Sequence, residues 1–259
     1  MTEHRGVEMY HFEAFDTVDG LTHGISRRHG GVSESPWASL NLGGSVGDAP
    51  EAVHENHARL CAALDVPRPS LVSSRLVHGD TVAVVGAHDR GTLVPQTDAL
   101  VTADPEVYLL VRCADCVPVL VVDPVRRVVG AAHAGWRGTL ALIAQKMVRT
   151  MVEAFGSDPA DLRVGVGPSI GPCCYEVGED VAAATRAAFG GEADALLRRR
   201  GGRMTLDLWE GNRRQVASLG VRDIIVSSVC TACQVHDYYS HRAEAGRTGR
   251  FAAVIGFRA

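Results

Sequence analysis

The sequence of 259 residues lacks the features that would send it into a membrane or out of the cell. Its first residues do not lead into an apolar core followed by a small-residue cleavage site, so no signal peptide is expected. The longest strongly apolar stretches, such as residues 117–122, are far shorter than the roughly 20 residues of a transmembrane helix. We therefore expect a soluble, cytoplasmic protein that has no membrane partner.

An excess of basic charge is also missing. The formal net charge is −4, so no overall positive field favours nucleic acid as a partner. The local cluster Arg198-Arg199-Arg200 stands beside Gly201-Gly202 and is expected to be a solvated loop. The hydrophobic and charged fractions, 46% and 22%, are those of an ordinary globular chain. No linker rich in Pro, Gly or Ser divides the chain, which favours a single domain over residues 1–259.

A disulfide framework is not expected, because the seven cysteines are odd in number and no secretion signal accompanies them. Cys61 stands on an apolar helical face and is expected in the core. The others form two C-x-x-C units, Cys113/Cys116 and Cys230/Cys233, and the adjacent pair Cys173-Cys174. Two interpretations stay open for those outside the site described next: reduced, partly buried thiols, or a separate four-thiolate zinc site.

Hydrophobic patterning predicts a mixture of strands and helices without strict alternation. Strand character is expected at residues 7–18, 71–76, 81–85, 98–102, 108–112, 117–123, 128–133, 162–166, 224–228 and 251–255. Helices are expected at residues 48–64, 135–155, 178–189 and 206–219, the first with Asp48 as its N-cap and Pro50 in its first turn. The short connections between strands favour an α/β sandwich with mixed sheets over a Rossmann fold.

Three potential metal ligands fall where strand ends or loops are expected: His78, Cys116 and His133. Two imidazoles and a thiolate suit Zn²⁺, and three protein ligands leave the fourth tetrahedral position open, as in catalytic zinc sites. Such a site lowers the pKa of a bound water towards neutrality. Because the three residues are dispersed in the sequence, the alternative that each is an ordinary buried side chain remains open.

A set of specific motifs extends from about residue 23 to 256, and the sharpest is His133-Ala-Gly-Trp-Arg-Gly138. The others are Ser26-Arg-Arg-His-Gly-Gly-Val-Ser33, Ser39-Leu-Asn-Leu-Gly43, Val77-His-Gly79, Ala114-Asp-Cys-Val-Pro-Val-Leu120, Gly167-Pro-Ser-Ile-Gly-Pro172 and Tyr175-Glu-Val177. In their combination and order these motifs resemble the YfiH/YlmD family, the laccase-domain or polyphenol oxidoreductase family, whose members are regarded as purine nucleoside phosphorylases.

The resemblance implies a single-domain α/β/β/α sandwich and zinc ligands at His78, Cys116 and His133. It also implies phosphorolysis of adenosine, inosine and S-methyl-5'-thioadenosine, with adenosine deaminase as a side activity. Two positions depart from the family pattern: Leu76 replaces a Gln before Val-His-Gly, and His241 replaces a Tyr in Tyr239-Ser-His-Arg242. The substrate contacts of that late loop are therefore open.

Phosphorolysis requires a purine nucleoside and phosphate as partners, and arginine suits phosphate because its planar fork donates two parallel hydrogen bonds. Candidate phosphate ligands are Arg28, Arg137, Arg242 and Arg250, together with the backbone of residues 135–138 at an expected helix start. Asn41 is a candidate for a ribose hydroxyl or base edge. Asp115 is a candidate for proton transfer or ligand orientation, and Glu176 for a deaminase proton shuttle.

Other functions remain as alternatives. A copper-dependent polyphenol oxidase is disfavoured because Cu²⁺ oxygen chemistry usually needs a richer set of ligands, and no dense His-x-His motif is present. A cysteine hydrolase acting on peptidoglycan precursors would use Cys116 as its nucleophile and His133 as its base. A non-enzymatic zinc-binding module is the least favoured. The sequence does not set the preferred nucleoside or the oligomeric state.

Overall fold

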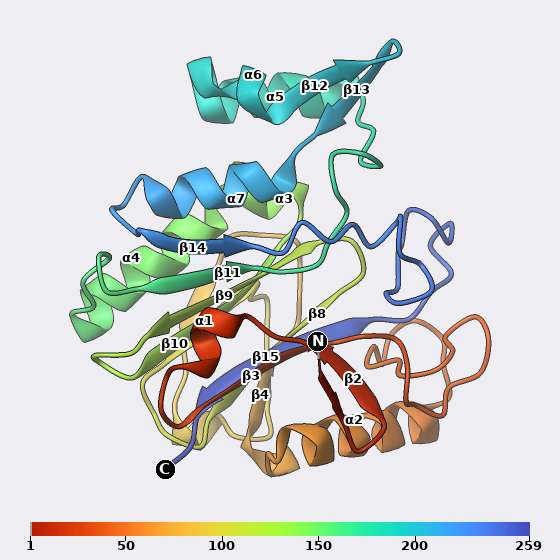
Figure 1. The fold of residues 1–259 in the computed structure, drawn as a ribbon, viewed down its shortest axis with the longest axis vertical. Helices are drawn as coiled ribbons and strands as arrows, with labels where there is room; N and C mark the ends of the chain where they lie inside the picture. The colour runs from red at the N-terminus through yellow and green to blue at the C-terminus, as the bar shows by residue number, and fades with distance from the viewer. Residues whose placement is uncertain (1) are drawn as a thin grey trace.

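Two β-sheets stacked face to face form the centre of the molecule, whose computed structural model describes residues 2–259 (Figure 1). The first sheet has seven strands in the order β1-β2-β3-β15-β8-β4-β6. Their bounds are β1 Thr2–His4, β2 Val7–Tyr10, β3 Leu21–Ser26, β15 Phe251–Phe257, β8 Tyr108–Cys113, β4 Leu71–Ser74 and β6 Leu93–Val94. Strand β4 runs parallel to β6 and β8, and the other pairs are antiparallel.

The second sheet has six strands in the order β14-β11-β9-β10-β7-β5. Their bounds are β14 Asp223–Val226, β11 Arg163–Val166, β9 Val117–Asp123, β10 Val128–Ala134, β7 Ala99–Thr102 and β5 Val82–Val84. Two pairs, β11/β14 and β5/β7, are parallel and the rest antiparallel, so both sheets are mixed.

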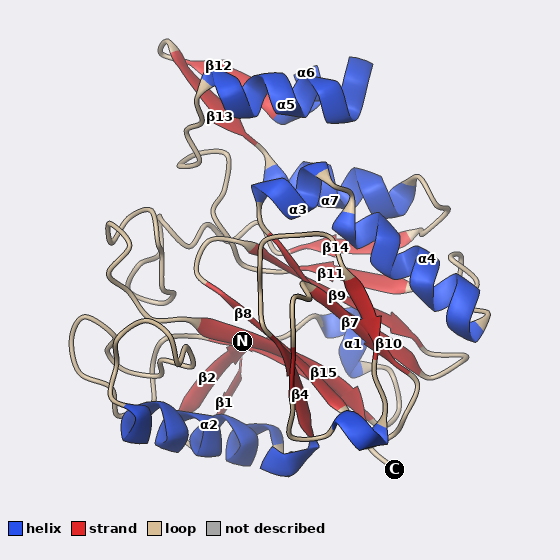
Figure 2. Cartoon of the chain, turned by 180° about the vertical axis from the view of Figure 1, so that it is seen from behind, coloured by secondary structure: helices blue, strands red, loops and turns tan. Residues whose placement is uncertain are grey.

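Helices cover the two outer faces, which gives four layers (Figure 2). Helix α2 (Pro50–Leu64) lies against the first sheet, and α3 (Trp136–Leu140), α4 (Ile143–Phe155) and α7 (Leu208–Ala217) lie against the second. The remaining elements are α1 (Glu13–Asp16), α5 (Glu179–Phe189), α6 (Ala193–Leu196), the hairpin β12 (Leu197–Arg200) and β13 (Arg203–Leu206), and 3₁₀ turns at Arg68–Ser70, Ala87–Asp89 and Gly190–Glu192. Among the described residues, no helix has the length and apolarity to span a bilayer.

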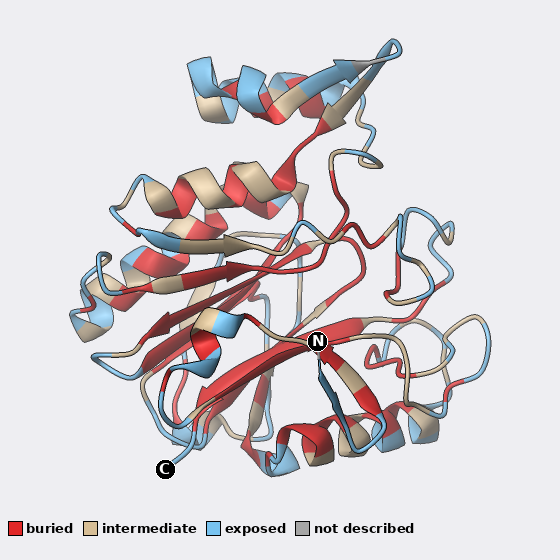
Figure 3. Ribbon diagram, in the orientation of Figure 1, coloured by how far each residue is buried: buried red, intermediate tan, exposed pale blue. Residues whose placement is uncertain are grey.

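The strands at the centre alternate their side chains between two cores, and the same alternation fixes the layers. Figure 3 shows these central strands in the red of buried residues. In β8, Leu109 and Val111 enter the core between the sheets, whereas Tyr108 and Leu110 face α2. In β9, Leu120 and Val122 enter the same central core, whereas Val117, Val119 and Val121 face the helices of the far side. Because both faces of each central strand are covered, these strands are continuously apolar.

The predicted α/β/β/α sandwich with mixed sheets is therefore confirmed. Three local predictions were wrong. The helix expected over residues 135–155 is broken at Leu142, which takes a left-handed conformation at φ 64°. The short helix before this break, α3, is anchored to α7, because Asn212 donates to the Thr139 hydroxyl and Gln215 to the Thr139 carbonyl.

The other two wrong predictions concern Asp48, which was expected to be a helix cap, and the arginine cluster, which was expected in a loop. Asp48 does not cap α2, whose N-cap is Ala49; its carboxylate instead accepts hydrogen bonds from the Ser33 hydroxyl and the Asn41 amide. The arginine cluster lies on a hairpin, because Gly201 and Gly202 adopt the positive φ values that a tight turn requires. Strand β3 was not foreseen, and the region 7–18 is strand β2 followed by helix α1.

Candidate functional site

The three predicted metal ligands meet at one end of the second sheet. Cys116 directly precedes β9, and His133 is the penultimate residue of β10, where it pairs with Pro118 of β9. His78 comes from the connection between β4 and β5 and holds a positive φ of 59°. One ligand atom from each lies within 4.8 Å of the other two. A hairpin and a neighbouring loop thus bring together donors that are dispersed in the sequence.

A residue that sequence reasoning missed, Asp98, organises this trio. Its buried carboxylate accepts a hydrogen bond of 3.0 Å from His133 Nδ1, which leaves Nε2 of that ring for a metal. The same carboxylate accepts from the backbone N–H groups of Val77, His78 and Gly79 at 3.2, 3.0 and 2.9 Å. One carboxylate therefore orients one histidine by its ring and the other by its backbone, as carboxylates behind zinc-binding histidines do.

The electrostatics favour the deprotonated form of Cys116. Burial alone would raise the pKa of this thiol, but His133 and His78 outweigh burial and lower the pKa to about 6. For His133, burial opposes the charged form, yet Cys116 and Asp98 raise its pKa to about 9. The two shifts have the same cause, since each group favours the charged form of the other. A thiolate and two imidazoles are also the donors that a divalent zinc ion takes up.

Gly135 leaves room for the ligand atoms at the start of α3. A Cβ atom at this position would lie 3.1 Å from Cys116 Sγ and 3.3 Å from His78 Cδ2. Because few real Cβ contacts are so short, a side chain here would displace a ligand. The glycine of the His133-Ala-Gly motif therefore has a direct steric role at the site.

The trio opens into a cavity of about 920 Å³, which is large enough for a nucleoside together with a small anion. Aromatic and aliphatic side chains, among them Trp136, Tyr175 and Leu208, form part of its wall. The loop that contains Gly43 and Gly44 lies at its rim. The cavity thus offers an apolar surface next to a cluster of polar donors.

Five arginines line the cavity: the predicted Arg137, Arg242 and Arg250, and the unforeseen Arg75 and Arg112. None of them forms an ion pair with a carboxylate in the described part of the chain. Burial lowers the pKa of both Arg112 and Arg250, which shows that their charges lack full compensation. Uncompensated guanidinium groups around a cavity favour an anionic ligand.

Two predicted substrate contacts do not line this cavity. The Arg28 side chain donates to the carbonyls of Ala38 and Val235, and it pairs with Glu244. Asn41 is fully buried, and its Oδ1 accepts from the backbone N–H groups of Gly43 and Arg250 at 2.9 and 2.8 Å. Asn41 therefore holds the rim loop and Arg250 in place, whereas Arg28 joins two loops behind the cavity.

The two acidic candidates, Asp115 and Glu176, also interact with other residues of the protein. Asp115 lines the cavity, but its two oxygens accept from the Thr231 hydroxyl at 2.7 Å and the Arg242 backbone N–H at 2.6 Å. Its φ of 87° turns the chain so that Cys116 follows at the strand end. Glu176 directs its carboxylate to Arg203 at 3.3 Å and is not a lining residue. Among the described residues, Asp115 is thus the acidic side chain of the cavity wall.

Comparison with known proteins places the chain in a family. The model of the family described as "Multi-copper polyphenol oxidoreductase laccase" matches residues 22–258. The chain belongs to this family. Within it, a protein of Deinococcus radiodurans named purine nucleoside phosphorylase is 46% identical over 236 residues, which cover 91% of this chain and 89% of the relative. Purine nucleoside phosphorylase YlmD of Geobacillus stearothermophilus is 41% identical, with 92% and 91% covered.

Solved structures of laccase-family members share the whole fold. The crystal structure of YlmD from Geobacillus stearothermophilus matches with a TM-score of 0.93 at 39% identity, covering 100% of this chain and 98% of that one. The YfiH structure of Bacillus licheniformis matches with a TM-score of 0.92 at 35% identity, covering 98% and 97%. The predicted membership of the YfiH/YlmD family is thus confirmed.

The family description and the names of the relatives indicate different chemistry, oxidation with several copper ions and phosphorolysis of nucleosides. The family description is that of metalloenzymes, and the trio fits a single ion with three protein donors. A multi-copper centre needs a larger set of histidines than the two that this group contains.

Proposed function

We propose that the chain is a zinc-dependent purine nucleoside phosphorylase that acts on adenosine, inosine and S-methyl-5'-thioadenosine. The relatives named purine nucleoside phosphorylase support an enzyme of this type, with nucleoside and phosphate as substrates. The observation that carries the proposal is the juxtaposition of unpaired arginines and the His78–Cys116–His133 trio in one cavity. Since both sheets share one central core, we further propose that residues 1–259 act as a single catalytic domain.

In this proposal the chain's own residues bind and orient both substrates. Arg250 holds phosphate: its Nη1 donates to the carbonyls of Thr248 and Gly249, which leaves the other N–H groups of the guanidinium available. Arg112 assists from the floor of the cavity, where its Nη2 donates to the Ser74 carbonyl. An oxygen of hydrogen phosphate then attacks the anomeric carbon and the bond to the purine nitrogen breaks. The proton that the hydrogen phosphate loses goes to the departing base.

The apolar wall provides the surface for the base, since Trp136 and Tyr175 are the aromatic side chains of the cavity. Arg137 and Arg242 stack on these two rings at 4.3 and 5.2 Å, so their charges lie beside the site for the nucleoside. A zinc ion held by His78, Cys116 and His133 would supply Lewis acidity at its open coordination position. The adenosine deaminase side activity has less support, because Glu176, the candidate proton shuttle, pairs with Arg203 outside the cavity wall, and both oxygens of Asp115 are engaged.

The direct test is incubation of the purified protein with inosine and phosphate while hypoxanthine is measured. We expect release that requires phosphate, stops after removal of metal by a chelator and returns with zinc. Parallel assays with adenosine and methylthioadenosine rank the substrates, and formation of inosine from adenosine reports deamination. If no purine nucleoside yields a base, while phenols are oxidised after addition of copper, the proposal is wrong.

A second candidate function has one specific observation in its favour. Cys116, His133 and Asp98 also have the order of a nucleophile, a base and a carboxylate that orients the base, which suits a cysteine hydrolase. The additional donor His78 favours the metal. Substitution Cys116→Ser separates the two, because a metal ligand loses both zinc and activity. Full zinc occupancy with lost activity would point to the hydrolase, with peptidoglycan precursors as the substrates to assay.

A further inference from the structure

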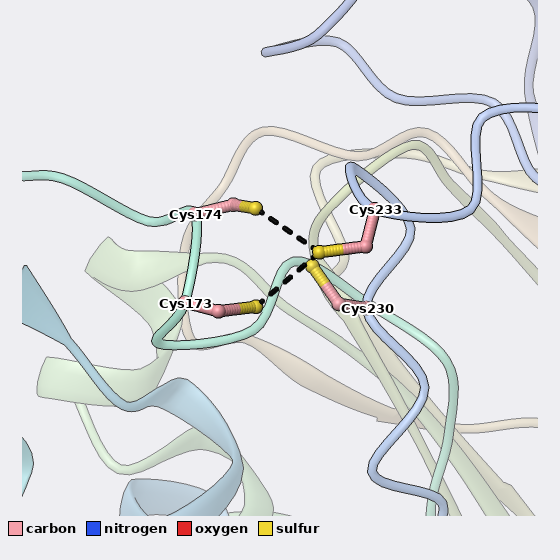
Figure 4. Close-up of side chains that lie close together, drawn as sticks. All are labelled: Cys173, Cys174, Cys230 and Cys233. Carbon is pink, nitrogen blue, oxygen red and sulfur yellow. Dashed lines mark hydrogen bonds between the residues drawn. The ribbon is translucent and has the colours of Figure 1, made fainter.

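Four cysteines that lie outside the cavity form a second cluster of soft donors: Cys173, Cys174, Cys230 and Cys233. The first two follow β11, and the second two follow β14, so the cluster joins two loops that are distant in the sequence. Figure 4 shows the four side chains converging on a common point from these loops. The four sulfur atoms lie within 4.8 Å of one another.

The sulfur geometry is that of a small tetrahedral site. Cys233 Sγ lies 3.3 Å from Cys174 Sγ and 3.6 Å from Cys173 Sγ. Zinc–sulfur bonds of about 2.3 Å in a tetrahedron place the sulfurs about 3.8 Å apart, so little movement would be needed. The same distances are far longer than the roughly 2.0 Å of a disulfide bond. Cys233 also approaches two partners, whereas a disulfide joins only two sulfurs.

The backbone around the cluster is already fixed without an ion. Ser169 and Cys230 form a β-bridge, and the Gly171 N–H donates to Cys230 Sγ at 3.2 Å. The Cys174 N–H donates to the Gly171 carbonyl at 3.0 Å and closes the turn that carries the adjacent pair. Preorganised donors lower the entropic cost of binding an ion.

We propose that Cys173, Cys174, Cys230 and Cys233 form a second, structural metal site that binds one zinc ion through four thiolates. Such a site is closed, since all four tetrahedral positions are filled by protein. The ion links the loop that leads to Tyr175 with the loop that leads to Arg242, and both residues line the cavity. Further along the two loops, the hydrogen bond from Arg242 Nη1 to the Glu176 carbonyl joins them again. The second ion therefore stabilises one wall of the cavity.

The test is the zinc content per chain of the full-length protein, purified under reducing conditions and loaded with Zn²⁺ alone. Wild type is expected to bind two ions, and Cys116→Ala and Cys233→Ser one each. The Cys116→Ala protein should show an X-ray absorption shell of four sulfurs at about 2.3 Å. Cys61→Ala is the matched control, because Cys61 is a buried cysteine of α2 outside both clusters, and it should retain two ions.

Cobalt loading of wild type gives a measurement that does not depend on a variant folding. Removal of zinc and addition of Co²⁺ should give the intense near-ultraviolet band of a cobalt centre with several thiolates, and Cys116→Ala should retain it. One zinc per wild-type chain, with a cobalt spectrum of a single thiolate, would overturn the proposal. So would a disulfide among these cysteines in protein handled without oxygen. These readouts are independent of phosphorylase activity, so the two proposals fail separately.

Discussion

The two clusters that we propose as metal sites differ in their side chains and in the elements that hold them. The trio of His78, Cys116 and His133 mixes nitrogen with sulfur, lies at the ends of sheet strands and opens into the cavity. The four-cysteine cluster has sulfur alone and lies on two loops, where Cys173 and Cys233 are exposed. A site that must place a reacting group needs rigid support and an open position, whereas a closed site supplies rigidity to loops that lack it.

The carboxylate of Asp98 is the rigid support that the trio has, because it forms hydrogen bonds with both histidines. Substitution Asp98→Asn places an amide N–H against donors that need an acceptor. We expect a loss of about 10–100-fold in metal affinity and in activity. Metal titration of the purified variant measures the first quantity, and hypoxanthine release the second.

Asp123→Asn is the matched control for Asp98. Asp123 is also buried and also accepts from backbone N–H groups, those of Val125 and Arg126, but it lies at the opposite end of the β9–β10 hairpin. Its substitution should leave metal affinity unchanged. An equal loss of affinity in both variants would mean that Asp98 matters only for folding.

The arginines distinguish the open site from the closed one, since they surround only the cavity. Arg250→Lys keeps a positive charge but loses the planar fork, so the KM for phosphate should rise about tenfold, which corresponds to about 1.4 kcal/mol. The KM for inosine should change much less. Initial rates over a grid of both substrate concentrations separate these effects. A rise confined to the KM for inosine would assign Arg250 to the nucleoside instead.

A smaller effect is expected at Gly135, where the protein leaves room for the metal ligands. Gly135→Ala brings a Cβ to 3.1 Å from Cys116 Sγ and should lower activity and metal retention severalfold. Gly44→Ala is the control for metal retention, because nothing lies within 4 Å of a Cβ at that cavity residue. Dialysis against a weak chelator followed by metal analysis gives the comparison. Equal retention in both variants would show that the site tolerates the crowding.

The smallest expected effect is a difference in thiol reactivity between the two clusters after all metal has been removed. The pKa of Cys116 is lowered to about 6, so this thiol is ionised above that pH and should react with iodoacetamide at pH 7. Desolvation and hydrogen bonds with neighbouring thiols raise the pKa of Cys173 to about 11, so it should react only at alkaline pH. Mass spectrometry of digested protein over a pH series measures both. Reaction of Cys173 before Cys116 would contradict the assignment.

Local sequence patterns were enough for the central strands, and together with the family motifs they pointed to the three side chains that the structure brings together. Strands β9 and β10 are continuous apolar runs, and the residues beside them stand out because they are His and Cys at strand ends. Asp98 was missed because its role depends on register. Pairing of β10 with β7 aligns Ala132 with Ala99 and so brings His133 beside the preceding Asp98. The local sequence around residue 98 contains no pattern that predicts this strand pairing.

Other predicted site residues show the same limit of local sequence patterns. Arg28 and Asn41 stand in glycine-rich loops that look like binding loops, yet their partners, such as Glu244 and Arg250, come from the other end of the chain. The spacing of the cysteines left two interpretations open, reduced thiols or a four-thiolate zinc site. In the structure Cys113 is buried in the core between the sheets, while Cys230 and Cys233 meet Cys173 and Cys174. Side-chain partners separated by many residues follow from the fold and not from spacing.

The β9–β10 hairpin has a practical consequence, since its exposed turn, where the chain can be modified, lies far from the cavity. Cys116 and His133 lie at its open end, and the turn that contains Val125 lies at the other, beyond Asp123, seven residues from Cys116, and Val128, five residues from His133. At about 3.3 Å per residue this is roughly 20 Å. Val125 is 67% exposed, so the turn can accept an inserted tag, a fluorophore or new chain ends. The protein can thus be labelled or immobilised there, far from the two proposed metal ligands of the hairpin.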